Sequence, residues 1–199
     1  MSHSRPKNHS FEKSLSILKD GNIRYATYKL EHPNINQQRR EALVSGQSPF
    51  AIILTCADSR VCPELIFDVG LGDIFTIRIA GNILDKAVLG SIEYAAVHLG
   101  VNLVVVMGHE SCGAVSAAIT GSKTDLHIDE LIEAITPAIA SVPGHKAEKL
   151  NQCVQENAKY VAEKIRSSEA VMKSLTEQGV KVLSAYYQIN DGMVRFLEE

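Results

Sequence analysis

Continuous apolar runs of strand length recur along the middle of the chain. Phe50 to Thr55 is such a run, Asp73 to Ile79 is a second strand-like run that includes polar residues, and Asn102 to Met107 is a third and the most strand-like. A run that is apolar at nearly every position is typical of a strand covered on both faces of a sheet. A fourth run, Val180 to Ile189, precedes a tight turn and a short partner segment, Met193 to Leu197, which together predict a hairpin.

Segments with helical spacing of apolar residues precede these strands and separate them. They are Phe11 to Tyr28, Gln37 to Ser45, Lys86 to Leu99, Cys112 to Ile119, Leu126 to Ser141 and Ala147 to Ser167. Strands that alternate with helices predict an α/β fold, with a mainly parallel central sheet flanked by helices. We expect one domain over residues 1–199, with an N-terminal helical arm at about 1–46 and an α/β core at about 47–199.

Composition and charge narrow the class of protein. Of the 199 residues, 45% are hydrophobic and 22% are charged, which excludes disordered, collagenous and coiled-coil chains. Lys and Arg number 20 against 23 Asp and Glu, so no general basic field would attract nucleic acid. No apolar stretch approaches the roughly 18 residues of a membrane span, and the polar N-terminus lacks a secretory signal. We therefore predict a cytoplasmic protein that binds neither nucleic acid nor membranes.

Two strand ends carry most of the reactive side chains. The sequence CADSR follows the first strand at residues 56–60, and GHESCG follows the third at residues 108–113. Ligands bind at the carboxyl ends of parallel strands, because the loops there converge on a crevice. Two thiols, an imidazole and a carboxylate form a set that suits zinc and is too soft for magnesium or calcium.

The spacing within each motif allows the side chains to converge. His109 and Cys112 are three residues apart at a helix entry, and Cys56 and Asp58 are two apart in an extended segment. With Cys56, His109 and Cys112 as ligands, the fourth position holds either water, in a catalytic site, or Asp58, in a closed one. An ion pair with Arg60 would draw the Asp58 carboxylate away from the metal.

The sequences CADSRV at 56–61 and GHESCGAV at 108–115 resemble the two signature motifs of the β-class carbonic anhydrases. The resemblance is dense over about residues 37–120, and includes GDIF at 72–75, RIAGN at 78–82 and GSIEY at 90–94. It implies one Zn²⁺ per chain, bound by Cys56, His109 and Cys112.

The resemblance also implies roles for residues around the metal. Asp58, paired with Arg60, would accept a hydrogen bond from the zinc-bound water or hydroxide. The residues that it places around the substrate are Gln47, Phe75, Tyr94 and Gly113. The side-chain amide of Gln47 would donate to a substrate oxygen, the two aromatic rings would form apolar walls, and the Gly113 N–H would face the substrate.

The implied reaction is the zinc-dependent, reversible hydration of carbon dioxide to bicarbonate and a proton, through attack by zinc hydroxide. Two alternatives remain at this stage. One is a hydrolase of a related small substrate, carbon disulfide or carbonyl sulfide, and the other is a non-catalytic zinc- or bicarbonate-binding module. A saturated site with four protein ligands would favour the non-catalytic module.

Assembly is a further expectation from the resemblance. Members of the family are dimers, or tetramers and larger forms built from dimers, with active sites at the interface. The segment Phe11 to Tyr28 could wrap a neighbouring subunit or fold back onto its own chain. The remaining cysteines, Cys62 and Cys153, form no C-x-x-C motif, and we predict that they take no part in the zinc site.

Overall fold

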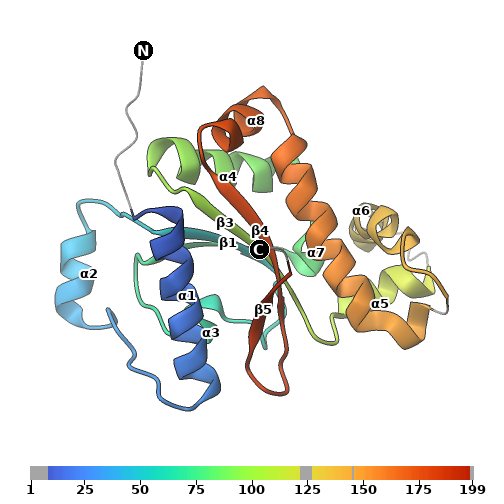
Figure 1. Ribbon diagram of the computed structural model, residues 1–199, viewed down its shortest axis with the longest axis horizontal. Coiled ribbons are helices and arrows are strands. Elements are labelled where there is room, and N and C mark those ends of the chain that lie inside the picture. The colour runs from blue at the N-terminus through green and yellow to red at the C-terminus, as the bar shows by residue number, and fades with distance from the viewer. Residues whose placement is uncertain (1–8, 122–126, 145, 198–199) are drawn as a thin grey trace.

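A five-stranded sheet forms the centre of the computed structural model, which describes residues 9–121, 127–144 and 146–197 (Figure 1). The strands are β1 (Ala51–Thr55), β2 (Ile74–Arg78), β3 (Leu103–His109), β4 (Lys181–Tyr187) and β5 (Val194–Phe196). Their order across the sheet is β2-β1-β3-β4-β5, and only the β4–β5 pairing is antiparallel. The predicted parallel sheet and the predicted C-terminal hairpin are both confirmed.

Helices flank the sheet, as predicted. They are α1 (Phe11–Ala26), α2 (Gln37–Leu43), α3 (Pro63–Ile66), α4 (Lys86–His98), α5 (Gly113–Thr120), α6 (Ile128–Ala140), α7 (Leu150–Ser167) and α8 (Ala170–Glu177), with 3₁₀ turns η1 (Ala80–Asn82) and η2 (Lys146–Lys149). The six predicted helices are present, although Leu126, the expected start of the fifth, lies outside the described residues. The helices α3 and α8 were not predicted, and α3 is a single turn of four residues, which gives too little periodicity to recognise.

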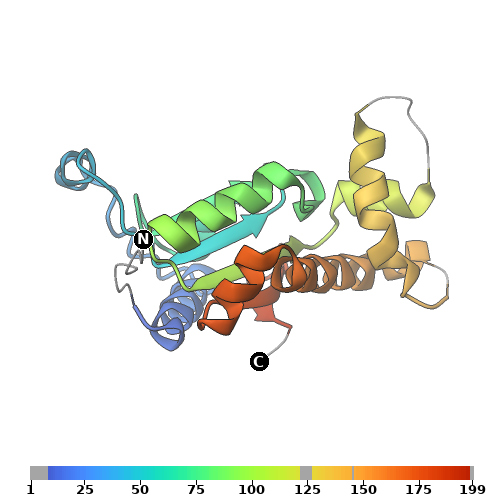
Figure 2. The same cartoon turned by 90° about the horizontal axis from the view of Figure 1, so that it is seen from above.

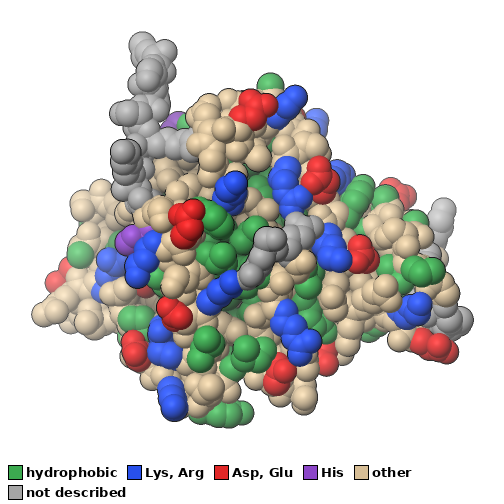
Figure 3. Space-filling view, viewed as in Figure 1, with side chains coloured by type: hydrophobic (Ala, Val, Ile, Leu, Met, Phe, Trp, Pro, Cys, Tyr) green, Lys and Arg blue, Asp and Glu red, His purple; other side chains and the backbone are tan. Residues whose placement is uncertain are grey.

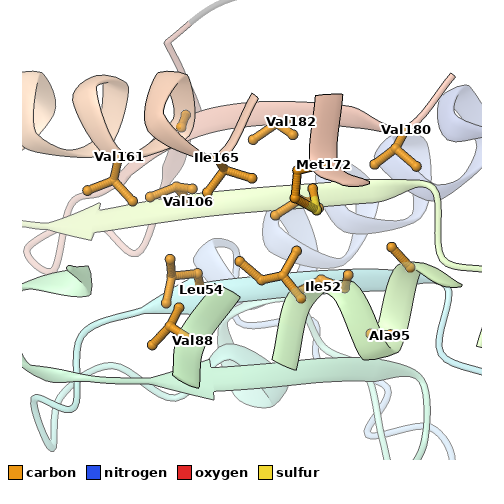
Figure 4. Close-up of a cluster of buried hydrophobic side chains, with 14 of the residues drawn as sticks. Ile52, Leu54, Val88, Ala95, Val106, Val161, Ile165, Met172, Val180 and Val182 are labelled. Carbon is orange, nitrogen blue, oxygen red and sulfur yellow. The ribbon is translucent and has the colours of Figure 1, made fainter. Parts of the chain in front are cut away.

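Alternate residues of the central strands face opposite helical layers. Ile52 and Leu54 point toward a buried cluster with α4, α7 and α8 (Figure 4), which lie on the face that Figure 2 views. Ala51 and Ile53 point to the other face, where α1 and α3 cover the sheet. Because both sets of side chains are buried, the strand reads as continuously apolar, which explains the sequence pattern.

A third buried cluster lies beyond the carboxyl ends of β1 and β3. It joins Cys56 and Cys112 to apolar residues of α5, α6 and α7, among them Val115, Ile135 and Val154. In Figure 1 these helices extend past one end of the sheet, and α2 projects at the opposite end. The two cysteine side chains therefore enter an apolar environment, although Ala57, Ser59 and Ser111 of the same segments are exposed.

The first helix packs on its own chain in this structure. Leu18 is fully buried against the sheet, and Asn22 donates to the carbonyl oxygens of Ile66 (3.1 Å) and Gly192 (2.8 Å). Asn22 Oδ1 also accepts from the Val194 N–H at 2.8 Å. Of the two possibilities for this helix, the structure therefore shows the intramolecular one, whereas α2 has no buried residue.

The surface carries charges of both signs. On the face shown in Figure 3, Lys and Arg side chains lie among Asp and Glu rather than in one basic patch. Within the described ranges, no helix combines the length and the apolar character needed to cross a bilayer.

The buried carboxylate of Asp68 fixes the segment that follows α1. Its Oδ2 accepts from Arg24 Nε at 2.6 Å, and its two oxygens accept from the backbone N–H groups of Glu31 and His32. Burial opposes the charged form, but these hydrogen bonds outweigh it, and the net effect lowers the pKa of Asp68. The charged carboxylate therefore stabilises the fold.

We predict that Asp68→Asn lowers the free energy of unfolding at pH 7 by about 2 kcal/mol, because buried donors lose their charged acceptor. A carboxyl group with a lowered pKa stabilises the fold above its unfolded-state pKa of about 3.9. The difference between the two proteins should therefore shrink as the pH falls below about 4. Urea unfolding across pH measures this, with the exposed Asp20→Asn as a control that should change stability by less than about 0.5 kcal/mol.

Candidate metal centre

Two adjacent strands and one helix bring together the three residues predicted to bind metal. Cys56 directly follows β1, His109 is the last residue of β3, and Cys112 caps the N-terminus of α5. Since β1 and β3 are parallel neighbours, their carboxyl ends adjoin. The two sulfurs and a ring nitrogen lie within 4.8 Å of one another, and all three residues are buried.

The imidazole of His109 is oriented by its own backbone. Nδ1 lies 2.9 Å from the carbonyl oxygen of Glu110, so this nitrogen carries the proton and donates. Nε2 is buried and has no hydrogen-bond partner among the described residues. A buried nitrogen lone pair without a partner is costly, and coordination of a metal ion would satisfy it.

The thiols of Cys56 and Cys112 lie close enough to change each other's pKa. A hydrogen bond from the Cys112 side chain, together with a hydrogen bond from the Gly81 N–H, lowers the pKa of Cys56. The neighbouring Cys56 sulfur and burial raise the pKa of Cys112. Two adjacent thiolates repel each other, and a divalent cation would stabilise both. Two soft sulfurs and an imidazole nitrogen fit Zn²⁺.

Asp58 lies beside this cluster and is paired with Arg60, as the spacing suggested. Its Oδ1 and Oδ2 accept from Arg60 Nε (2.9 Å) and Nη2 (2.7 Å), and this pairing holds the pKa of Asp58 well below its usual range. Oδ2 is 3.9 Å from His109 Nε2. Arg60 Nη2 also donates to the Ser111 carbonyl at 3.3 Å, which links the two motifs. The carboxylate is thus next to the ligands but engaged by the guanidinium.

Arg78 was not among the predicted site residues. It ends β2 opposite Thr55, and its guanidinium donates to the carbonyl oxygens of Cys56 (3.4 Å), Ala57 (3.2 Å) and Asp58 (2.8 Å). These bonds fix the backbone that carries both a ligand and the carboxylate. The sequence does show that Arg78 is a charged residue at the carboxyl end of a predicted strand. It does not show the register between β2 and β1, which places the guanidinium beside these carbonyl groups.

The predicted substrate residues are divided between the two ends of the sheet. Gly113 is exposed at the start of α5, next to Cys112. Gln47 is exposed before β1, whereas Cys56 follows that strand. Phe75 pairs with Ile52 in the amino half of β1.

Tyr94, the fourth predicted substrate residue, is 49% exposed on α4, with its ring 6.4 Å from that of Phe75. A single chain therefore does not bring Gln47, Phe75 and Tyr94 to the sulfur cluster.

The other two cysteines have different surroundings, and Cys153 shares a buried apolar cluster with Cys56 and Cys112. Cys62 caps α3, with Sγ 3.8 Å from a Glu64 carboxylate oxygen, and Cys153 is buried on α7. Neither belongs to the group of possible metal ligands found in the described part of the chain. That they take no part in the site stays a prediction.

Comparison with known proteins places the chain in a family. Residues 51–194 match the family model described as carbonic anhydrase. Carbonic anhydrase 2 of Mycobacterium tuberculosis is 38% identical over 180 residues, which cover 88% of this chain and 87% of that protein. The carbonic anhydrase of Mycolicibacterium smegmatis is 39% identical over 185 residues, with coverage of 89% and 88%.

Solved structures agree with the fold. A tetrameric β-carbonic anhydrase of Sordaria macrospora superposes with a TM-score of 0.73 at 24% identity, covering 95% of this chain and 97% of that one. The β-carbonic anhydrase CafA of Aspergillus fumigatus superposes with a TM-score of 0.71 at 26% identity, with coverage of 94% and 90%. The chain therefore belongs to the β-carbonic anhydrase family.

Proposed function

We propose that this chain binds one Zn²⁺ through Cys56, His109 and Cys112, and uses it to hydrate carbon dioxide reversibly to bicarbonate and a proton. Hydration of carbon dioxide is the general reaction of the family to which the chain belongs. The observation that carries the zinc proposal is the buried set of two sulfurs and one imidazole, whose Nε2 has no partner among the described residues.

The protein supplies the position and charge of the ligands. Zn²⁺ held by them would lower the pKa of a bound water from about 15.7 to about 7, and so supply hydroxide near neutral pH. The Glu110 carbonyl keeps the His109 proton on Nδ1 and leaves Nε2 for the metal. The apolar residues around Cys56 and Cys112 exclude water from the sulfurs.

Asp58 orients the attacking oxygen in this proposal. Its ionised carboxylate would accept the hydrogen of the attacking oxygen, and so direct the lone pair of that oxygen to the substrate carbon. The two hydrogen bonds from Arg60 support this role, because they hold the carboxylate beside the ligands and keep it from taking the fourth metal position. Asp58 and Arg60 would thus maintain an open site.

A second copy of the chain would complete the substrate pocket. Gln47 would donate its amide N–H to a substrate oxygen, Phe75 and Tyr94 would form apolar walls, and the Gly113 N–H at the start of α5 would face the substrate. Three of the four lie away from the sulfur cluster within one chain.

The surface around Gln47 supports such an assembly. Gln47 lines an open groove with Leu43, Val44 and Leu71, and Val44 is 88% exposed. The strand β2 is also an edge of the sheet. The relative from Sordaria macrospora is a tetramer. We propose self-association as a dimer or tetramer, with this groove in the interface.

The three ligand residues alone do not show whether the substrate is carbon dioxide, carbon disulfide or carbonyl sulfide, so both sulfur compounds belong in the same assays.

We further propose a cytoplasmic location. None of the four cysteines, all of which lie in the described ranges, forms a disulfide, which suits a reducing compartment.

We predict about one zinc per chain in the purified protein. Cys56→Ser should lose the metal and lower carbon dioxide hydration by about 100-fold or more, because a serine hydroxyl is a poor zinc ligand. Metal analysis and stopped-flow hydration assays measure both quantities. Cys62→Ser is the matched control and should retain zinc and turnover. A Cys56→Ser protein with full zinc and full activity would contradict the proposal.

Asp58→Asn should retain zinc but lower kcat/KM for carbon dioxide by about 100-fold, because the amide no longer orients the attacking oxygen. Stopped-flow kinetics and metal analysis on the same sample separate the two effects. The exposed Asp20→Asn should behave as the unaltered protein. Loss of metal with loss of activity would instead make Asp58 a ligand.

Val44→Glu should weaken self-association by at least about tenfold and lower activity in proportion, because the interface would have to bury a charge. Sedimentation and activity measured over a range of protein concentrations test this. Val171 is also an exposed apolar residue, but it lies on α8, so Val171→Glu is the control and should change neither self-association nor activity. Unchanged assembly in Val44→Glu would exclude this groove from the interface.

A further inference from the structure

A backbone hydrogen bond reaches one of the proposed ligand sulfurs from the turn after β2. The Gly81 N–H donates to Cys56 Sγ, with an N···S distance of 3.3 Å. On its other side, the Gly81 carbonyl accepts from Asn157 Nδ2 of α7 at 2.9 Å. Gly81 is thus held between a ligand sulfur and a buried amide that is 76 residues away in sequence.

The turn around Gly81 accepts only glycine without rearrangement. Its φ is +69°, in the left-handed region that favours glycine. A Cβ atom there would lie 2.6 Å from Ile135 Cδ1 and 3.1 Å from Ala114 Cβ. Since α5 and α6 press on this position, the turn has little freedom to move, and the direction of its N–H is well defined.

Asn157 occupies a position where an apolar residue would be expected. It is fully buried on α7 beside Val154, Ala158 and Val161, which belong to the apolar face of that helix. Its Oδ1 has no hydrogen-bond partner among the described residues. An unpaired buried amide oxygen costs about 1–3 kcal/mol, so packing alone does not explain this residue.

We propose that Asn157 is a positioning residue for the metal centre: it holds the Gly81 carbonyl, and so keeps the Gly81 N–H directed at Cys56 Sγ. This inference rests on the proposed function, in which Cys56 is a metal ligand. A hydrogen bond to a ligand sulfur withdraws electron density from it, so the sulfur donates less charge to the metal. In a site with two anionic sulfurs, this contact preserves the Lewis acidity of the ion.

The test uses Co²⁺ in place of zinc, because the sulfur-to-cobalt charge-transfer band reports the electron density on the sulfurs. In Asn157→Leu, which keeps the size of the side chain but donates nothing, the band should move to longer wavelength. Affinity for Co²⁺, measured by competition with a chelator, should fall by about tenfold. Val161→Ala lies one turn along the same buried face, and should lower stability without moving the band.

An unshifted band in folded Asn157→Leu, or an equal shift in Val161→Ala, would overturn the inference. Asn157→Ala serves as a second variant if the leucine does not fit. The unaltered protein provides an independent measurement: with an NMR-active cadmium isotope bound, scalar coupling from the metal to the Gly81 amide proton is expected through the hydrogen bond. Its absence would also overturn the inference. Failure of the unaltered chain to bind Co²⁺ or cadmium would instead refute the proposed metal site itself.

Discussion

The parallel pairing of β1 with β3 is the constraint on which the rest of the site depends. Thr55 lies opposite Met107, so Cys56 and His109 leave the sheet at nearly the same level on neighbouring strands. Cys112 follows within one turn of chain and caps α5. A slip of one residue in this register would turn every buried side chain of β1 to the other layer, and the ligand atoms would no longer meet.

Hydrogen bonds that involve backbone groups orient several parts of this site. The Glu110 carbonyl sets the His109 ring, the Gly81 N–H contacts Cys56 Sγ, and Arg78 acts on three consecutive carbonyls rather than on a side chain. Rigid elements surround these groups, because α5, α6 and α7 form one buried cluster beyond the strand ends. A metal ion bound here, as proposed, would meet ligands whose geometry is already fixed, which would limit the reorganisation needed for binding.

In the proposed function, the division of the predicted pocket between the two ends of the sheet would make substrate binding depend on assembly. The ligands lie beyond the carboxyl ends of the strands, whereas Gln47 lies at the amino end of β1. The helix α2 next to it buries no residue of its own, and the groove beside it exposes Val44. Contact between copies would cover this apolar surface and would also bring substrate residues to the proposed metal. The same association that buries the apolar surface would then complete the catalytic site.

The sequence by itself determined the strands, the longer helices and the candidate ligands. Continuous apolar runs identify β1 and β3 because both faces are covered, and CADSR and GHESCG place reactive side chains at the ends of those strands. Asp58 and Arg60 are two residues apart, so their pairing is a local property that spacing alone can suggest. The helix α3 was missed because its four residues are too few to show periodicity, and α8 was missed as well.

Only the tertiary structure decided which distant groups meet. Arg78 reaches the Cys56 backbone because β2 pairs with β1, and Asn157 reaches Gly81 because α7 packs across the strand ends. Neither contact has a local signature, since each joins segments more than 20 residues apart. The same is true of α1, whose amphipathic pattern does not say which surface it covers, whereas the structure packs it on the chain's own sheet. Periodicity and spacing report what each segment can bury, whereas the register between segments sets what each residue touches.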